Sequence, residues 1–123
     1  MARHNTQGKW GESKAVELLV REGYSIVDTN WHMGRFEIDI IALRDEILVF
    51  AEVKTRTDLD VDPLEAVDSR KIAHMVRSAD AYLRHTGLPY QVRFDLFAIN
   101  GTEDDFRIEH VPDAFYPPLK SYR

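Results

Sequence analysis

Two charged clusters interrupt apolar stretches of the sequence and lie close to each other along the chain. Glu37-Ile38-Asp39 and Glu52-Val53-Lys54 each stand where an apolar run should continue. Carboxylates at buried strand positions are costly unless they are paired, protonated or bound to a metal ion. Lys54 follows Glu52 by two residues, so the two side chains share one face of a strand. Two carboxylates and an ammonium on one face are the groups that metal-dependent phosphodiester cleavage needs.

The residues around the two clusters predict a β-hairpin with strands Phe36–Leu43 and Ile47–Lys54. If Asp45-Glu46 is its two-residue turn, the register leaves one face wholly apolar, which favours this register over one shifted by a residue. That face pairs Ile38, Ile40 and Ala42 with Val53, Ala51 and Val49.

The second face of the predicted hairpin changes from apolar at the turn to charged at the far end. There Asp39 lies opposite Glu52, and Glu37 lies opposite Lys54. Directly opposed side chains have Cβ atoms about 4.5–5.5 Å apart, a distance at which like charges repel. Asp39 opposite Glu52 is therefore unfavourable without a cation or a shared proton.

The elements that must position these residues follow from the rest of the pattern. A helix is expected from Gly8 to Gly23, capped by Asn5 or Thr6, and a second helix from Ser69 to Gly87, capped by Asp68 or Ser69. The sequence predicts an α/β fold in which helices flank a mixed central sheet of about five strands. Beyond the hairpin, the predicted elements are strands at Tyr24–Trp31, Tyr90–Asn100 and Phe106–Val111, and a helical turn at Pro63.

Composition predicts one domain over residues 1–123, with a core at about 5–111 and an extended, Pro-containing tail at 112–123. The chain has no cysteine, which excludes disulfides and thiolate metal sites. No signal peptide and no apolar run of about 20 residues is seen, so we expect a cytoplasmic protein without a membrane anchor. A net charge of −5 argues against a protein that simply coats nucleic acid.

The chemistry that these residues permit is that of a hard divalent cation, Mg²⁺ or Mn²⁺, which prefers oxygen ligands. Asp39 and Glu52 supply two carboxylates, and the carbonyl of Val53 could add a third oxygen. Lys54 could orient the attacking water or stabilise charge on the phosphate. Glu12 lies in line with the apolar stripe of the first helix. It could be a solvated glutamate, or it could reach the same end of the sheet as a ligand, directly or through water.

With Asp39 as the first acid and Glu52-Val53-Lys54 as the E-x-K element, the chain resembles the PD-(D/E)xK nuclease superfamily. The segments Gly11-Glu12, Glu37–Ala42 and Phe50–Arg56 are similar to the YraN family of small bacterial proteins, related by fold to archaeal Holliday-junction resolvases. The resemblance spans roughly Asn5 to Asp95. One departure is Phe36, where relatives often carry Gly.

The resemblance implies a restriction-endonuclease-like core and a catalytic set of Glu12, Asp39, Glu52 and Lys54. It implies cleavage of phosphodiester bonds in DNA, including branched or otherwise structured DNA. By analogy with resolvases, which must cut two strands, it also favours a homodimer. A nuclease fold can also serve as a non-catalytic nucleic-acid-binding module or an interaction domain.

Several single residues carry two interpretations. Asp39, Glu52 and Lys54 could form a buried ion network and nothing more. Glu37 could be a further metal ligand or the partner of Lys54. Lys71 could face the same cleft or be solvated. Lys9, Arg35 and Arg56 are candidate phosphate contacts that could equally be surface charges. None of the five histidines has the spacing of a metal site or is predicted to be catalytic.

Overall fold

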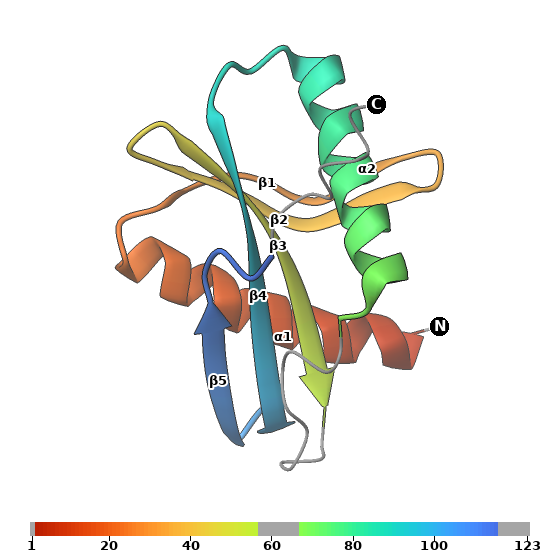
Figure 1. Cartoon of the computed structure of the whole chain (residues 1–123). Coiled ribbons are helices and arrows are strands. Elements are labelled where there is room, and N and C mark those ends of the chain that lie inside the picture. The colour runs from red at the N-terminus through yellow and green to blue at the C-terminus, as the bar shows by residue number, and fades with distance from the viewer. Residues whose placement is uncertain (1, 57–66, 116–123) are drawn as a thin grey trace.

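The computed structural model describes residues 2–56 and 67–115, with side chains from residue 9 onward. The described residues form two helices and five strands in the predicted order of helix, three strands, helix and two strands, arranged as in Figure 1. Their bounds are α1 (Ala2–Arg21), β1 (Ser25–Met33), β2 (Phe36–Arg44), β3 (Ile47–Arg56), α2 (Ser69–Thr86), β4 (Gln91–Thr102) and β5 (Asp105–Val111).

The five strands form one mixed sheet in the order β1-β2-β3-β4-β5. Strands β3 and β4 are parallel, and the other neighbours are antiparallel. In Figure 1, α1 lies behind this sheet and α2 in front of it. This confirms the predicted α/β architecture, which is consistent with a restriction-endonuclease-like fold.

The central strands are apolar on both faces because each face is covered by a helix. On the α1 side, Ala15 and Leu19 pack against Ile40 and Val49. On the α2 side, the buried stripe of the helix packs against the alternate residues of the same strands. That second cluster contains Met75, Ala79, Tyr82, Ile41, Leu48, Phe50 and Phe94.

The predicted hairpin register is confirmed near the turn, where Leu43 pairs with Leu48 and Ile40 with Ala51. Asp45 and Glu46 both have positive φ, 52° and 66°, as the two central residues of a type I′ turn require. Beyond Ile40 and Ala51 the described ladder between β2 and β3 ends.

Three predicted pairs of the hairpin are therefore wrong: Ile38 with Val53, Asp39 with Glu52, and Glu37 with Lys54. Ile38 packs in the cluster on the α2 side, although Ile40 belongs to the α1 side. The strict alternation of faces on which the three pairs depended breaks between Ile38 and Ile40, where the ladder with β3 ends.

The ends of the helices are predicted with mixed success. Gly23 follows α1 at a φ of 93° and Gly87 caps α2 at 71°, both in the left-handed region that favours glycine. Asp68 caps α2 by accepting a hydrogen bond of 2.9 Å from the backbone N–H of Lys71. The predicted start of α1 at Gly8 is wrong, since the helix begins at Ala2 and includes Asn5 and Thr6.

The end of the described chain packs back on the sheet. The backbone N–H of Ala114 donates to the carbonyl of Phe94 at 2.7 Å, and the rings of Phe94 and Phe115 stack at 5.1 Å. The turn predicted at Pro63 and the tail after Phe115 lie outside the described residues. Of the helices that the structure describes, none is long and apolar enough to cross a membrane.

Candidate active site

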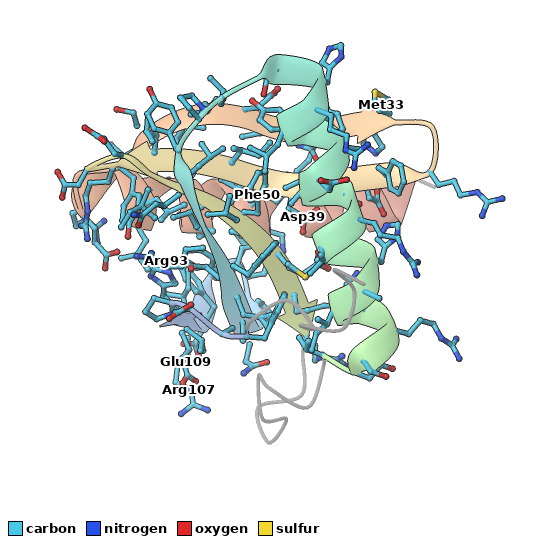
Figure 2. The ribbon with its side chains drawn as sticks, turned by 45° about the horizontal axis from the view of Figure 1, so that its top comes forward. Met33, Asp39, Phe50, Arg93, Arg107 and Glu109 are labelled. Atoms are coloured by element: carbon cyan, nitrogen blue, oxygen red, sulfur yellow. The ribbon has the colours of Figure 1, made fainter. Side chains whose placement is uncertain are left out.

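The site is built at the point where β2 and β3 part, which we call the strand fork. Here the Asp39 carboxylate takes a role that a strand carbonyl has elsewhere in the ladder: its Oδ2 accepts a hydrogen bond of 2.9 Å from the backbone N–H of Val53. A side chain at the ladder's end satisfies the freed donor, as buried backbone groups require. The fork therefore holds one acid in place at its apex; Figure 2 labels this residue, Asp39.

Glu52 comes from the other side of the fork and is held by two lysines. Its Oε2 lies 2.8 Å from Nζ of Lys71 on α2 and 4.0 Å from Nζ of Lys54 on β3. The Glu52 side chain is only 14% exposed, whereas that of Lys54 is 36% exposed. Lys54 therefore has the freedom to meet a bound phosphate, while Lys71 is the principal partner of Glu52.

Glu12 reaches this end of the sheet because α1 crosses β3 at very short range. Gly11 is buried, and a Cβ at this position would overlap the Oγ1 atom of Thr55. The next residue, Glu12, accepts a hydrogen bond of 2.8 Å through Oε1 from the side-chain amide of Asn30. Asn30 sits in β1 with a φ of 53°, a left-handed conformation that asparagine tolerates better than most residues.

Burial and like charge act together on these acids. Burial, followed by the charges of Glu52 and Glu12, raises the pKa of Asp39 to about 7. The hydrogen bond from Val53 and the charge of Lys71 work in the opposite direction and lower that pKa. The pKa of Glu12 is likewise raised by burial and by the Glu52 charge, against the lowering effect of Asn30. The three carboxylates therefore act on one another electrostatically, as the sequence predicted for two of them.

Lys71 supplies the positive charge that offsets part of this repulsion. Burial alone would lower the pKa of Lys71, but its hydrogen bond to Glu52 and the charges of Glu52, Asp39 and Glu37 raise it. The ammonium thus occupies a position where negative charge converges. Of the two interpretations of Lys71, the ion pair with Glu52 favours the one that places it beside these acids over a freely solvated side chain.

The chemistry of these side chains suits a divalent cation, because their carboxylate oxygens repel one another and already attract the ammonium group of Lys71. Within the described part of the chain, however, no three His, Cys, Asp or Glu side chains are grouped tightly enough to hold one ion. As ligands of one cation, Asp39, Glu52 and Glu12 therefore stay a prediction, which would require Lys71 to share or yield its place at Glu52. The Val53 carbonyl stays a prediction as a ligand.

Other predicted residues are placed less centrally. Glu37 does not pair with Lys54; its carboxylate lies 3.2 Å from Nε2 of His32, and its backbone N–H donates to the Ser78 hydroxyl at 3.4 Å. Lys9, Arg35 and Arg56 are exposed on α1, the β1–β2 turn and the end of β3, and their role as phosphate contacts stays a prediction.

Two residues of the site were not found by sequence reasoning in their present roles. Asn30 was missed because nothing in a strand pattern marks an amide that reaches a helix 18 residues away. The pairing of Lys71 with Glu52 was missed because it depends on how α2 crosses the sheet.

The comparison with known proteins gives the chain its family. The model of the uncharacterised protein family UPF0102 matches residues 11–99. The chain belongs to the UPF0102 family. This confirms the family resemblance drawn from the motifs, and the matched segment contains Gly11, Glu12, the strand fork and α2.

Individual UPF0102 proteins match over almost their whole length. A UPF0102 protein of Parabacteroides distasonis is 45% identical over 121 residues, which cover 98% of this chain and all of the relative. One from Bacteroides thetaiotaomicron is 48% identical over 120 residues, covering 97% and 99%. One from Flavobacterium psychrophilum is 44% identical over 117 residues, covering 94% and 98%.

Proposed function

We propose that this UPF0102 protein is a metal-dependent nuclease that hydrolyses phosphodiester bonds in DNA, with branched or structured DNA as the favoured substrate. The observation that carries the proposal is the buried Asp39 carboxylate beside Glu52 and Glu12: burial first, and then the charges of these two acids, raise its pKa to about 7. Such mutual repulsion is what a bound Mg²⁺ or Mn²⁺ would relieve. Because carboxylates that lie close together destabilise a fold, stability alone does not explain why these three acids are neighbours.

The roles of the residues follow from their positions. Asp39, fixed by the Val53 N–H, and Glu52 would hold the cation, and Glu12 would complete the shell directly or through water. The bound cation would polarise the scissile phosphate and lower the pKa of a water molecule. Lys54, half-exposed beside Glu52, would donate to a phosphate oxygen or orient the water. Lys71 would neutralise Glu52 until the cation binds.

The test is a cleavage screen over single-stranded, duplex, flap and four-way DNA with Mg²⁺ or Mn²⁺. We expect cleavage of at least one substrate, lost by a factor of about 10² or more in Asp39→Ala, Glu52→Ala and Lys54→Ala. Glu109→Ala is the matched control, because it removes an exposed carboxylate from β5. Unchanged cleavage in all three site variants would refute the assignment, provided that their folding is shown by circular dichroism.

A second candidate function is a nucleic-acid-binding module without turnover. The observation that favours it is the 2.8 Å ion pair of Lys71 with Glu52, which satisfies that carboxylate without a metal ion. Salt-sensitive binding with no product from any substrate of the screen would select this function over the first.

A further inference from the structure

Helix α2 is strongly basic in an acidic protein. Between Ser69 and Thr86 it carries four Lys or Arg residues and one Asp, a net charge of +3 in a chain of net charge −5. Three of the cations, Arg70, Arg77 and Arg84, are spaced by seven residues. Seven residues are close to two helical turns, so the three side chains form one stripe along the helix. We call this set the arginine stripe.

The arginine stripe faces away from the sheet. All three of its side chains are exposed, and they lie opposite the stripe that α2 buries, which consists of Met75, Ser78, Ala79 and Tyr82. The fold therefore does not need these arginines for packing. Among the described residues, the ion pair found for the stripe joins Arg84 to Asp80 at 2.9 Å; both side chains are more than half exposed. Such an exposed pair is weak and exchanges readily for another anion.

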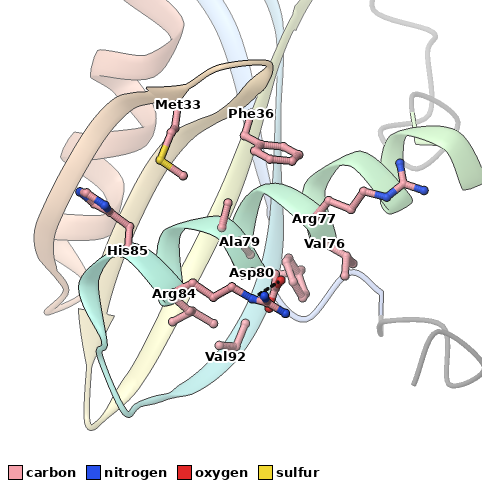
Figure 3. Close-up of a pocket in the computed structure, with 12 residues that line it drawn as sticks. Met33, Phe36, Val76, Arg77, Ala79, Asp80, Arg84, His85 and Val92 are labelled. Atoms are coloured by element: carbon pink, nitrogen blue, oxygen red, sulfur yellow. Dashed lines mark ion pairs between the residues drawn. The ribbon is translucent and has the colours of Figure 1, made fainter. Parts of the chain in front are cut away.

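The surface beside the stripe is recessed. A hollow of about 890 Å³ follows α2 between the β1–β2 turn and β4. Figure 3 shows Arg77 and Arg84 along it, with Met33 and Phe36 on one side of the helix and Val92 on the other. None of the acids of the strand fork lines this hollow. It is a separate surface, reached from the fork along α2.

The stripe begins where the acid site ends. Arg70 is the neighbour of Lys71, whose ammonium contacts Glu52 at the fork. From Arg70 to Arg84 the helix rises about 21 Å, at about 1.5 Å per residue. That length corresponds to about six base pairs of duplex at about 3.4 Å each.

We propose that the arginine stripe binds the phosphate backbone of a duplex arm that extends about six base pairs away from the bond at the acid site. This inference rests on the proposed function and adds how the substrate is held. The acids at the fork and the net charge of −5 repel a polyanion, so a substrate needs a positive track that leads to the fork. The stripe supplies one, and it predicts contacts that follow backbone shape without reading base sequence.

The test measures binding of a labelled four-way junction and a labelled duplex by fluorescence anisotropy, in the Asp39→Asn background to prevent cleavage. We expect the double variant Arg77→Gln/Arg84→Gln to bind about 10–100-fold more weakly at 100 mM salt. The slope of log affinity against log salt should fall in magnitude by about 2. Lys14→Gln/Arg21→Gln is the matched control, because it removes two cations with the same spacing from α1.

An equal loss of affinity in both double variants would overturn the inference, because it would reflect net charge alone. The inference would also be overturned if the α2 variant bound DNA as before but no longer bound phosphatidylserine-containing vesicles. That result would show that the stripe binds membrane surfaces. Cleavage by the Asp39-containing protein is measured separately. If the wild-type protein binds DNA through the arginine stripe but never cleaves it, the proposed catalysis is wrong and the binding role of the stripe is supported. If the wild-type protein cleaves DNA and the stripe variants bind normally, the catalysis is supported and the binding role of the stripe is wrong.

Discussion

Asp39 combines two demands that conflict at neutral pH. Its Oδ2 must accept the Val53 N–H that the parting strands leave free, and it does so beside two other carboxylates. Either a proton or a cation removes the conflict. Because its pKa is raised to about 7, a proton removes the conflict in mildly acidic solution, and under the proposed function a divalent cation would remove it above neutrality.

This gives a prediction for Asp39→Asn, whose amide oxygen can still accept the Val53 N–H. Between about pH 4 and pH 7 the folded state binds a proton at Asp39 that the unfolded state lacks, so the free energy of unfolding falls as pH rises through this window. The variant should therefore be roughly 1–3 kcal/mol more stable than wild type at pH 8 and similar to it at pH 4. Urea titrations in EDTA at both pH values measure this.

The control for this prediction is Asp104→Asn, which changes an exposed acid in the β4–β5 turn. Its stability relative to wild type should not depend on pH in the same way. If Asp39→Asn is less stable than wild type at pH 8, the ionised Asp39 carboxylate does not destabilise the folded protein.

Among the elements, the contact of α1 with β3 sets where Glu12 lies. Gly11 allows the helix to approach Thr55 so closely that no larger residue fits without a shift. The Cβ position at Gly11 is otherwise open enough, with the nearest other atom, Cδ1 of Ile99, at 3.5 Å. The hydroxyl of Thr55 is therefore the specific obstacle.

The prediction is a double-mutant cycle. Gly11→Ala should destabilise the wild-type protein, although alanine is the better helix former by about 1 kcal/mol. In a Thr55→Ala background the same change should become neutral or stabilising, a coupling of about 1–2 kcal/mol. Thermal or urea unfolding of the four proteins measures it. Equal effects of Gly11→Ala in both backgrounds would rule out the Thr55 contact as the reason for glycine.

The elements were predictable wherever one physical rule dominated. Apolar alternation placed the hairpin register, because a slip by one residue would mix the apolar face of Ile40 and Ala51 with the face that carries the charged residues. The end of the ladder was not predictable, because it depends on the Asp39 carboxylate bonding to a backbone N–H across the fork. The start of α1 was misplaced because Asn5 and Thr6 are good caps in isolation, and a local preference does not decide where a helix starts.

The candidate site was predictable in its acids and less so in their partners. Asp39, Glu52 and Lys54 follow from residue type and spacing, and Glu12 from its place on the first helix and the family resemblance. In the structure the charges of Glu52 and Glu12 act on Asp39, and Lys54 lies 4.0 Å from Glu52. Asn30, the pairing of Lys71 with Glu52 and the position of Glu37 beside His32 depend on the packing of elements distant in sequence. Their geometry is a tertiary property that no local pattern encodes.

At the scale of the whole molecule, a second charged network on the far part of the sheet has a different character. Asp95 is fully buried and is hydrogen-bonded at 2.8 Å by Arg93, which also donates to the Tyr24 hydroxyl at 2.6 Å. Nε2 of His110 lies 2.7 Å from Oδ2 of Asp95, and the backbone N–H of Asp113 donates to Oδ1 of Asp95 at 3.0 Å. Figure 2 shows Arg93 well apart from Asp39. This network joins β4 to β5 and to the chain after it.

Burial would raise the pKa of Asp95, but the hydrogen bonds from Arg93, His110 and Asp113 hold it below its usual value. Its stabilising contribution is therefore present above about pH 4 and lost as pH falls through the lowered pKa. Asp95→Asn should cost about 2–4 kcal/mol at pH 7, because Arg93 loses its buried partner. The difference from wild type should narrow below pH 4. A cost that does not change with pH would contradict the role of the charge.

The two networks thus predict opposite pH responses in one molecule: Asp95 contributes stability that depends on its charge, and Asp39 carries a charge that costs stability. The structural network lies toward β5, and the acids that cost stability lie at the strand fork. This separation is the pattern expected when one cluster serves the fold and the other serves chemistry.

The most direct test of the proposed metal site is the initial rate of cleavage of a labelled four-way DNA substrate as a function of Mn²⁺ concentration, for wild type and Asp39→Asn. We expect a rate that rises and saturates with Mn²⁺ in the wild-type protein and is at least about 10²-fold lower in the variant at every concentration. Equal rates in the two proteins, or no Mn²⁺-dependent cleavage by a folded wild type that binds the substrate, would contradict the proposed metal site.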